Sequence, residues 1–185
     1  SAEVRLEGDN NSGIQYRSRE LPAVAPWVIT GYQCDIHPAT EHTGMTYEEK
    51  GRGIFGLNGH NVMLDPEGAL WEISEHDPVK ADVSQWNEYV IITKGNHLSH
   101  FINGQPTSEL IDHDASKRAL EGLLAIQLHR GNPNSVHIKD LRLKVLPDAP
   151  LVPFDAAKLP AGAKKIEKPR TKSPQGTGPV VTPKK

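Results

Sequence analysis

The chain has a single cysteine, no long apolar segment and almost no helical periodicity, and each of these scarcities excludes a class of protein. Cys34 is the only cysteine among 185 residues, so the chain forms no internal disulfide and no metal site built from several cysteines. No stretch approaches the roughly 18 to 20 consecutive apolar residues of a membrane-spanning helix, so we expect no membrane span. Residues 1–10 show no signal-peptide pattern.

Positive charge is scarce in most of the chain and concentrated at its end. Residues 1–157 carry 13 Lys and Arg against 22 Asp and Glu, whereas residues 158–185 carry eight Lys and Arg against one acid, Glu167. Because nucleic acids bind mainly through Lys and Arg contacts to phosphates, the acidic body argues against a nucleic-acid partner. Eight of the fifteen prolines lie from Pro147 onward, in a segment too poor in apolar residues to fold. We therefore predict one domain over residues 1–147 and a disordered tail over 148–185.

Short alternating apolar runs, bounded by Gly, Pro, Asn and Asp, recur along the body and indicate an all-β sandwich. Gly95-Asn96 and Asn103-Gly104 have the composition of tight hairpin turns. Residues 2–18 are predicted to form one hairpin with its turn at 8–13, and residues 114–121 a short helix or a loop. The predicted strands are residues 2–8, 14–18, 27–37, 53–57, 61–64, 69–74, 87–94, 97–102, 122–129 and 135–146.

Several of these strands carry specific hydrogen-bonding residues on one face. Alternation places Gln33 and Asp35 on a common face of one strand, and Gln127 and His129 on a common face of another. If these strands are neighbours, the four residues and Arg17 form one polar patch. Such side chains suit the hydroxyl groups of a sugar. The alternative is a strand face that is polar only because it meets solvent.

Seven segments together carry a resemblance to a known family. They are NSGIQYRS (11–18), GYQCDI (31–36), YEEKGRG (47–53), WNEY (86–89), GNHLSHFING (95–104), LAIQLHR (124–130) and KDLRL (139–143). In this order and spacing they resemble the 3-keto-disaccharide hydrolase domain family over about residues 4–146.

The resemblance implies a concanavalin-like jelly-roll sandwich of two antiparallel sheets and activity on glycosides whose C3 hydroxyl has been oxidised to a ketone. Members of the family begin with further strands, so the chain is expected to lack its first strands and to expose a sheet edge. A periplasmic or extracellular location is also implied. The alternative is a non-catalytic, lectin-like, glycan-binding module of a larger secreted protein.

A ketone at C3 makes the C2 proton acidic, so cleavage needs a base and a group that stabilises the enolate. His129 is the first candidate base, with Asp35 or His100 as its partner. Arg17, or a divalent metal held by His129 and Asp35, would stabilise the oxyanion; no cofactor is otherwise implied. The predicted substrate-binding residues are Gln33, Tyr47, Arg52, Asn87, Asn103 and Gln127, with Tyr47, Trp71 and Trp86 as candidate platforms for the sugar ring.

Structural alternatives exist for several of these residues. His100 precedes a hairpin turn and can simply pack beside it, Asn87 can cap the loop before its strand, and Asn103 can be a turn residue. The order Gln33-x-Asp35-x-His37 lacks the paired carboxylates of a retaining glycosidase, which argues against ordinary retaining glycoside hydrolysis. The remaining histidines are predicted to be solvated: His37, His42, His60, His76, His113 and His137.

Overall fold

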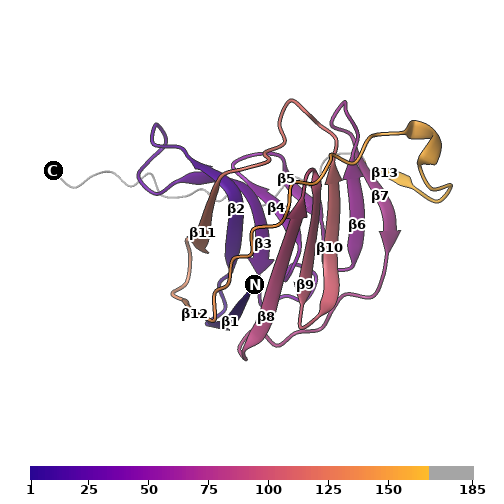
Figure 1. The fold of residues 1–185 in the computed structure, drawn as a ribbon. Helices are drawn as coiled ribbons and strands as arrows, with labels where there is room; N and C mark the ends of the chain where they lie inside the picture. The colour runs from indigo at the N-terminus through magenta and orange to yellow at the C-terminus, as the bar shows by residue number, and fades with distance from the viewer. Residues whose placement is uncertain (167–185) are drawn as a thin grey trace.

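The computed structural model describes residues 1–166, which form two β-sheets packed face to face (Figure 1). The larger sheet contains β1 (Ala2–Glu7), β6 (His60–Leu64), β7 (Leu70–Glu75), β8 (Asn87–Lys94), β9 (His97–Ile102), β10 (Gln105–Asp112), β12 (Ser135–Lys139) and β13 (Lys164–Ile166). The smaller contains β2 (Ser12–Glu20), β3 (Ile29–Ile36), β4 (Thr46–Glu49), β5 (Gly53–Gly56) and β11 (Leu123–Leu128). The strand orders are β12-β1-β8-β9-β10-β6-β7-β13 and β11-β2-β3-β4-β5. The predicted all-β sandwich is confirmed.

The core lies between the two sheets and is built from alternating residues of their strands. On β1, Val4 and Leu6 are each 1% exposed and pack in one cluster with Cys34 and Ile36 of β3. Tyr32 belongs to a second cluster, which also includes residues of β9 and β10. Because side chains alternate along a strand, these inward residues of β3 leave its other face for residues 33 and 35.

Both predicted hairpin turns are confirmed. Residues 95–96 join β8 to β9, and Asn103 and Gly104, with φ values of 51° and 76°, join β9 to β10. One pairing differs from the expected pair of antiparallel sheets, because β10 lies parallel to β6. Each strand from β6 to β10 runs opposite to the strand before it, so β6 and β10 run in the same direction. They become neighbours because the β8–β9–β10 meander returns beside β6.

The predicted hairpin over residues 2–18 is wrong. β1 pairs with β8 and β12 in the larger sheet, whereas β2 pairs with β3 and β11 in the smaller one. The intervening turn residues therefore carry the chain from one layer to the other. Asn10 lies in this crossing and donates to the carbonyl oxygens of His129 and Asn132, at 3.0 and 2.9 Å, in the return crossing between β11 and β12.

Residues 148–166 lie along the larger sheet, so the predicted tail is wrong for this segment. The Val152 amide donates to Asn96 Oδ1 at 2.8 Å, and the Phe154 ring lies 5.3 Å from the ring of His113. A 3-10 turn at Ala156–Lys158 precedes β13, which pairs with β7. These partly buried apolar side chains and the Asn96 side chain hold the segment in place. The rest of the predicted tail, 167–185, lies outside the described residues.

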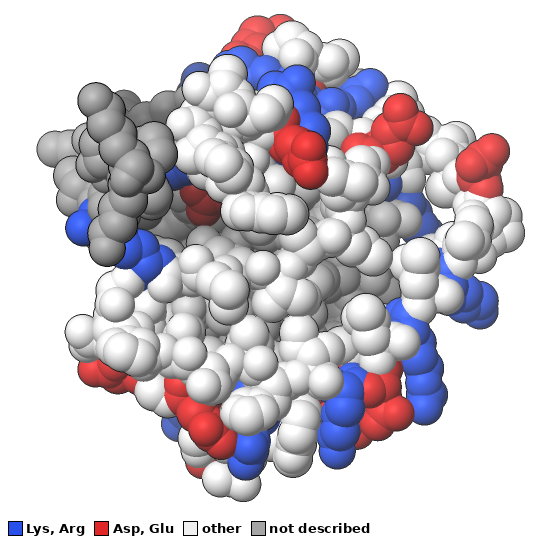
Figure 2. Space-filling view, turned by 90° about the vertical axis from the view of Figure 1, so that its left-hand side faces the viewer, with Lys and Arg blue, Asp and Glu red and all other residues white. Residues whose placement is uncertain are grey.

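One side of the sandwich exposes apolar side chains. β11 is an edge strand whose Leu124 and Leu128 are 55% and 79% exposed. The predicted strand 135–146 ends at Lys139, and Leu141 and Leu143 beyond it are also exposed. Figure 2 shows this side, where charged side chains lie mainly around the margins of a largely uncharged middle. Within residues 1–166, no helix is long and apolar enough to cross a bilayer.

Candidate functional site

The outer face of the smaller sheet carries a cluster of polar residues that we call the outer polar group: Gln33, Asp35 and Gln127. Strand pairing places them together, since Gly13 of β2 lies between Asp35 on β3 and Gln127 on β11. Although they face away from the core, Gln33 and Asp35 are only 1% and 2% exposed. The sequence prediction that these three residues meet is confirmed.

Hydrogen bonds link the outer polar group through Gln33. Its Nε2 donates to Asp35 Oδ1 at 2.6 Å and to Gln127 Oε1 at 3.3 Å. Gly13 makes room for this side chain, because a Cβ at that position would lie 2.6 Å from Gln33 atoms. The other Gln33 atom, Oε1, is buried and has no hydrogen-bond partner among the described residues. A buried acceptor without a donor is uncommon in folded proteins, and this one has the capacity to accept a hydrogen bond from a water, a hydroxyl or an amide.

Asp35 has the acid–base character of a group that works near neutral pH. Burial raises the pKa of this carboxyl to about 7, although the hydrogen bond from Gln33 lowers it. The negative charge of Glu49 raises it further, and a hydrogen bond from Asn11 lowers it. A carboxyl with a pKa near 7 is present in both protonation states at neutral pH, so it can both accept and donate a proton.

His129 lies at the same end of the sheet, but it is exposed. Its Nδ1 lies 3.0 Å from Asn10 Oδ1, and the next residue, Asn11, is the one that hydrogen-bonds to Asp35. His37 is close enough to His129 to feel its charge: burial lowers the pKa of His37, and the charges of His42 and His129 lower it further. The His37 and His42 rings are 4.9 Å apart. Contrary to the prediction that these two are simply solvated, they form a half-buried group beside the outer polar group.

His100 is not part of this group, so its predicted partnership with His129 is wrong. It is 0% exposed between the two sheets, where its Nε2 is 2.7 Å from Tyr16 Oη and its Nδ1 is 3.3 Å from Thr46 Oγ1. Burial lowers the pKa of His100 to about 4, although hydrogen bonds to the backbone of residues 44 and 45 raise it. The imidazole is therefore neutral at pH 7 and serves the packing of the core, the structural alternative given above.

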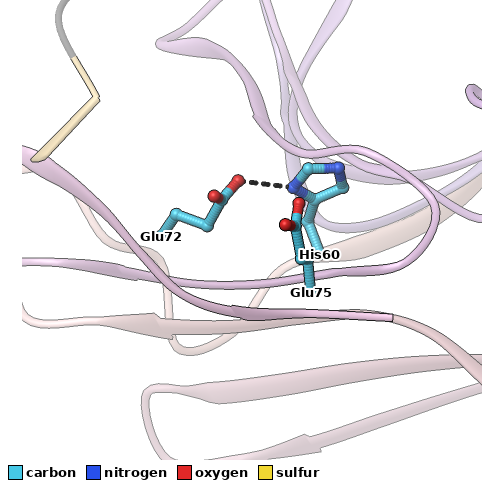
Figure 3. A group of neighbouring side chains, drawn as sticks. All are labelled: His60, Glu72 and Glu75. Atoms are coloured by element: carbon cyan, nitrogen blue, oxygen red, sulfur yellow. Dashed lines mark hydrogen bonds and ion pairs between the residues drawn. The ribbon is translucent and has the colours of Figure 1, made fainter. Parts of the chain in front are cut away.

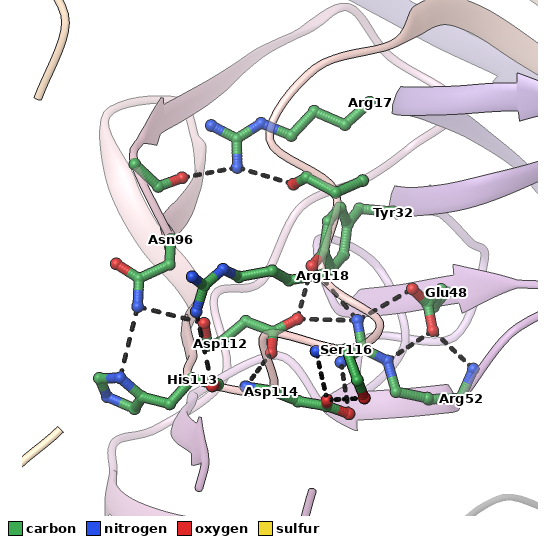
Figure 4. Close-up of polar contacts among 12 residues, drawn as sticks. Arg17, Tyr32, Glu48, Arg52, Asn96, Asp112, His113, Asp114, Ser116 and Arg118 are labelled. Carbon is green, nitrogen blue, oxygen red and sulfur yellow. Dashed lines mark hydrogen bonds and ion pairs between the residues drawn. The ribbon is translucent and has the colours of Figure 1, made fainter. Parts of the chain in front are cut away.

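Arg17 is also turned away from the outer polar group. The register between β2 and β3 shifts between Tyr16 and Arg19, and Arg17 has a φ of 48°. A bulge of this kind breaks the alternation on which the prediction relied. The guanidinium donates instead to the carbonyl oxygens of Gly95 and Ala119, at 2.7 and 3.2 Å (Figure 4).

Arg52 belongs to a separate network on the inner side of the sheet and does not join the outer polar group, and its role in substrate binding stays a prediction. It binds Glu48 through Nε at 2.7 Å and Asp112 through Nη2 at 2.7 Å, and Asp112 also accepts from the Tyr32 hydroxyl (Figure 4). Burial alone would lower the pKa of Arg52, but Glu48 and Asp112 raise it well above its usual value. We call Arg52, Glu48, Asp112 and His100 the inner polar group.

Asn87 and Asn103 have structural partners as well. Asn87 Nδ2 donates to the carbonyl oxygens of Asp82 and Gln85, and its Oδ1 accepts from Asn103 Nδ2 at 2.8 Å. Asn103 Oδ1 in turn accepts from the Glu88 amide at 2.9 Å. Both side chains thus hold the start of β8 against the end of β9 in the larger sheet, apart from the outer polar group. Their role as sugar ligands stays a prediction.

Of the three candidate aromatic platforms, Tyr47 lies next to the outer polar group. It is half-buried and pairs across the strands with Gln33. The other two, Trp71 on β7 and Trp86 directly before β8, belong to the larger sheet. Trp71 donates to Asp65 Oδ2 at 2.9 Å, and the Trp86 ring lies 4.4 Å from Lys139 Nζ. Neither of these two tryptophans can support a sugar bound at Asp35.

The residues at this face fit a hydrogen-bonding site better than a metal centre. Asp35 accepts from Gln33 and Asn11, and His129 contacts Asn10. In residues 1–166, the group of three or more potential ligands that lie within 4.8 Å of one another is His60, Glu72 and Glu75, which does not include Asp35 or His129. A metal held by those two residues stays a prediction.

Comparison with known proteins adds a family to this geometry. A family model described as a 3-keto-alpha-glucoside-1,2-lyase-like domain matches residues 1–144, which cover the two sheets apart from β13. A search of curated proteins found no match. The family resemblance seen in the sequence motifs is thereby confirmed, and the outer polar group lies within the matched region.

Proposed function

Because this chain belongs to the 3-keto-alpha-glucoside-1,2-lyase-like domain family, we propose that it cleaves glycosides that carry a ketone at C3. The outer polar group is the proposed active site. The single observation that carries the proposal is Asp35, a buried carboxyl with a pKa of about 7 beside a buried, unpartnered Gln33 acceptor.

The proposed reaction begins with proton transfer from C2 of the sugar to the Asp35 carboxylate. The electron pair of the broken C2–H bond forms the enolate of the C3 ketone. Collapse of the enolate expels the aglycone from C1 and leaves a double bond between C1 and C2. Water then adds, with its oxygen at C1 and a proton returned to C2, so the net reaction is hydrolysis. A base with a pKa near the working pH is well matched to both proton transfers.

The neighbours of Asp35 supply binding and a second proton donor in this proposal. Gln33 Oε1 accepts a hydrogen bond from a sugar hydroxyl, and the half-buried Gln127 and Tyr47 border the same position. His129, which is exposed and held by Asn10, protonates the departing aglycone oxygen. The roles first considered for Asp35 and His129 are thus exchanged, because burial tunes Asp35 to neutral pH.

Aglycone release tests the proposal. A chromogenic 3-keto-glucoside should be cleaved by the full chain, and the unoxidised glucoside should not. Asp35→Asn should lower kcat/KM by at least about 100-fold, the usual contribution of general base catalysis. Glu109→Gln is the matched control, because this carboxylate pairs with His97 on the larger sheet and should leave kcat/KM unchanged. Absence of release by wild-type protein would overturn the proposal.

The competing lectin-like module has a distinct result in the same experiment. It would bind the 3-keto-glucoside without turnover, and binding would survive in Asp35→Asn. We further propose a periplasmic or extracellular location, which fractionation of the source cells would test directly.

A further inference from the structure

A second cluster of chemically reactive side chains lies on the larger sheet, away from the outer polar group. His60 of β6 and Glu75 of β7 are direct cross-strand partners, and Glu72 of β7 lies 2.7 Å from His60 through its Oε2 and His60 Nδ1 (Figure 3). One ligand atom from each residue lies within 4.8 Å of those of the other two. Figure 3 shows the imidazole and the two carboxylates pointing toward one another.

A β-bulge brings the three side chains to one face. Residues 72 and 75 are three apart, so on an unbroken strand they would point to opposite faces. The β6–β7 register instead shifts between Asn61 and Val62, which places Glu72 opposite Val62 while Glu75 remains opposite His60. Ile73 is the extra residue on β7, between Ser74 opposite Asn61 and Glu72 opposite Val62. Since His60 and Val62 share a face, Glu72 lies on the same face as the histidine. Bulges that re-aim a side chain in this way are common beside functional sites.

The cluster combines burial with access to solvent. Glu72 is 9% exposed and His60 is half-buried, while Glu75 is exposed. The nearby cation is Lys164 of β13, whose Nζ is 3.9 Å from Glu72 Oε1 and whose side chain is 72% exposed. The negative charges of the two carboxylates are therefore only weakly neutralised by this solvent-exposed lysine. The remaining negative charge favours binding of an added cation beside the imidazole.

We propose that His60, Glu72 and Glu75 form a binding site for a divalent transition metal of the zinc class. Zinc takes imidazole nitrogen and carboxylate oxygen at about 2.0 to 2.2 Å, which sets the ligand atoms of a tetrahedral site roughly 3.4 Å apart. Small side-chain movements close the present spacing to that value. Three protein ligands leave a fourth position for water. Calcium and magnesium suit the site less well, because they prefer six or more oxygen ligands.

Zinc titration of the full chain tests this site without reference to turnover. Calorimetry should give one Zn²⁺ per chain, with Ca²⁺ and Mg²⁺ bound far more weakly. His60→Ala and Glu75→Gln should each weaken Zn²⁺ binding at least tenfold. Because Glu75 is exposed, its variant should unfold at the same temperature as wild type when no metal is present.

His97→Ala is the matched control. His97 pairs with Glu109 across β9 and β10 in the same sheet, so it is a histidine–carboxylate pair outside the three-residue cluster. Its replacement should leave Zn²⁺ affinity unchanged. The proposal is overturned if wild type binds no Zn²⁺, or if His60→Ala and Glu75→Gln bind it as wild type does, as they would if His37, His42 and His129 held the ion.

Discussion

The outer and inner polar groups flank the same sheet and are both largely buried, but they differ in how their charges are satisfied. In the inner group, the charge of Arg52 is matched by Glu48 and Asp112, although its Nη1 has no hydrogen-bond partner among the described residues. His100 is neutral and hydrogen-bonded. In the outer group, Asp35 has no cationic partner among residues 1–166, and Gln33 Oε1 has no hydrogen-bond donor there. The difference therefore lies in charge pairing: removing one partner of a buried ion pair leaves an uncompensated charge, whereas Asp35 has no paired cation to lose.

The largest expected effect comes from breaking the inner group. Arg52→Met leaves the buried Glu48 and Asp112 carboxylates without their cation, so the free energy of unfolding should fall by about 3 to 5 kcal/mol. Denaturant unfolding measures this loss. Asp35→Asn removes a charge with no paired cation and should not destabilise the protein at pH 7. If the free energy of unfolding fell equally in Arg52→Met and Asp35→Asn, the proposed difference between the two groups would be contradicted.

The pH dependence of stability should separate the groups more finely. Folded Asp35 keeps its proton up to about pH 7, whereas the unfolded side chain releases it near its ordinary pKa of about 3.9. The free energy of unfolding therefore falls as pH rises through that window. His100 acts in the opposite direction, because the unfolded imidazole takes up a proton near pH 6.5 and the folded one only near pH 4. Its contribution is lost as pH falls from about 6.5 to 4.

Denaturant unfolding of wild type, Asp35→Asn and His100→Gln between about pH 4 and 8 measures both slopes. The stability of Asp35→Asn relative to wild type should increase with pH, by a few kcal/mol at most, since one pKa unit corresponds to about 1.4 kcal/mol. His100→Gln should be less stable than wild type at neutral pH and lose less stability on acidification. Parallel curves for all three proteins would contradict the pKa shifts of both residues.

Much of the fold follows from alternation of apolar residues, and the exceptions have a physical cause. β4 and β10 were not predicted because their inward faces carry polar residues such as Thr46 and Ser108, which hydrogen-bond to each other at 2.8 Å in the interior. The turn at residues 8–13 was recognised, but turn composition does not tell whether the chain reverses within a sheet or crosses to the other one.

The candidate site divides along similar lines. Gln33, Asp35 and Gln127 were predicted because β3 and β11 keep strict alternation, whereas Arg17 was misplaced by a one-residue bulge. His100 was misplaced because a polar residue on an inward face looks like one on an outward face. The cluster at His60 depends on another bulge and on pairing between two strands, and neither is visible in the chain order alone.

Exchange of the C2 hydrogen tests the central claim most directly. A 3-keto sugar without a leaving group at C1 can lose and regain its C2 proton but cannot be cleaved. In D2O, NMR should show deuterium entering C2 with wild-type protein and with His129→Ala, and at least about 100-fold more slowly with Asp35→Asn. Exchange that persists in Asp35→Asn, or that does not exceed the rate in buffer with wild type, would contradict the assignment of Asp35 as the base.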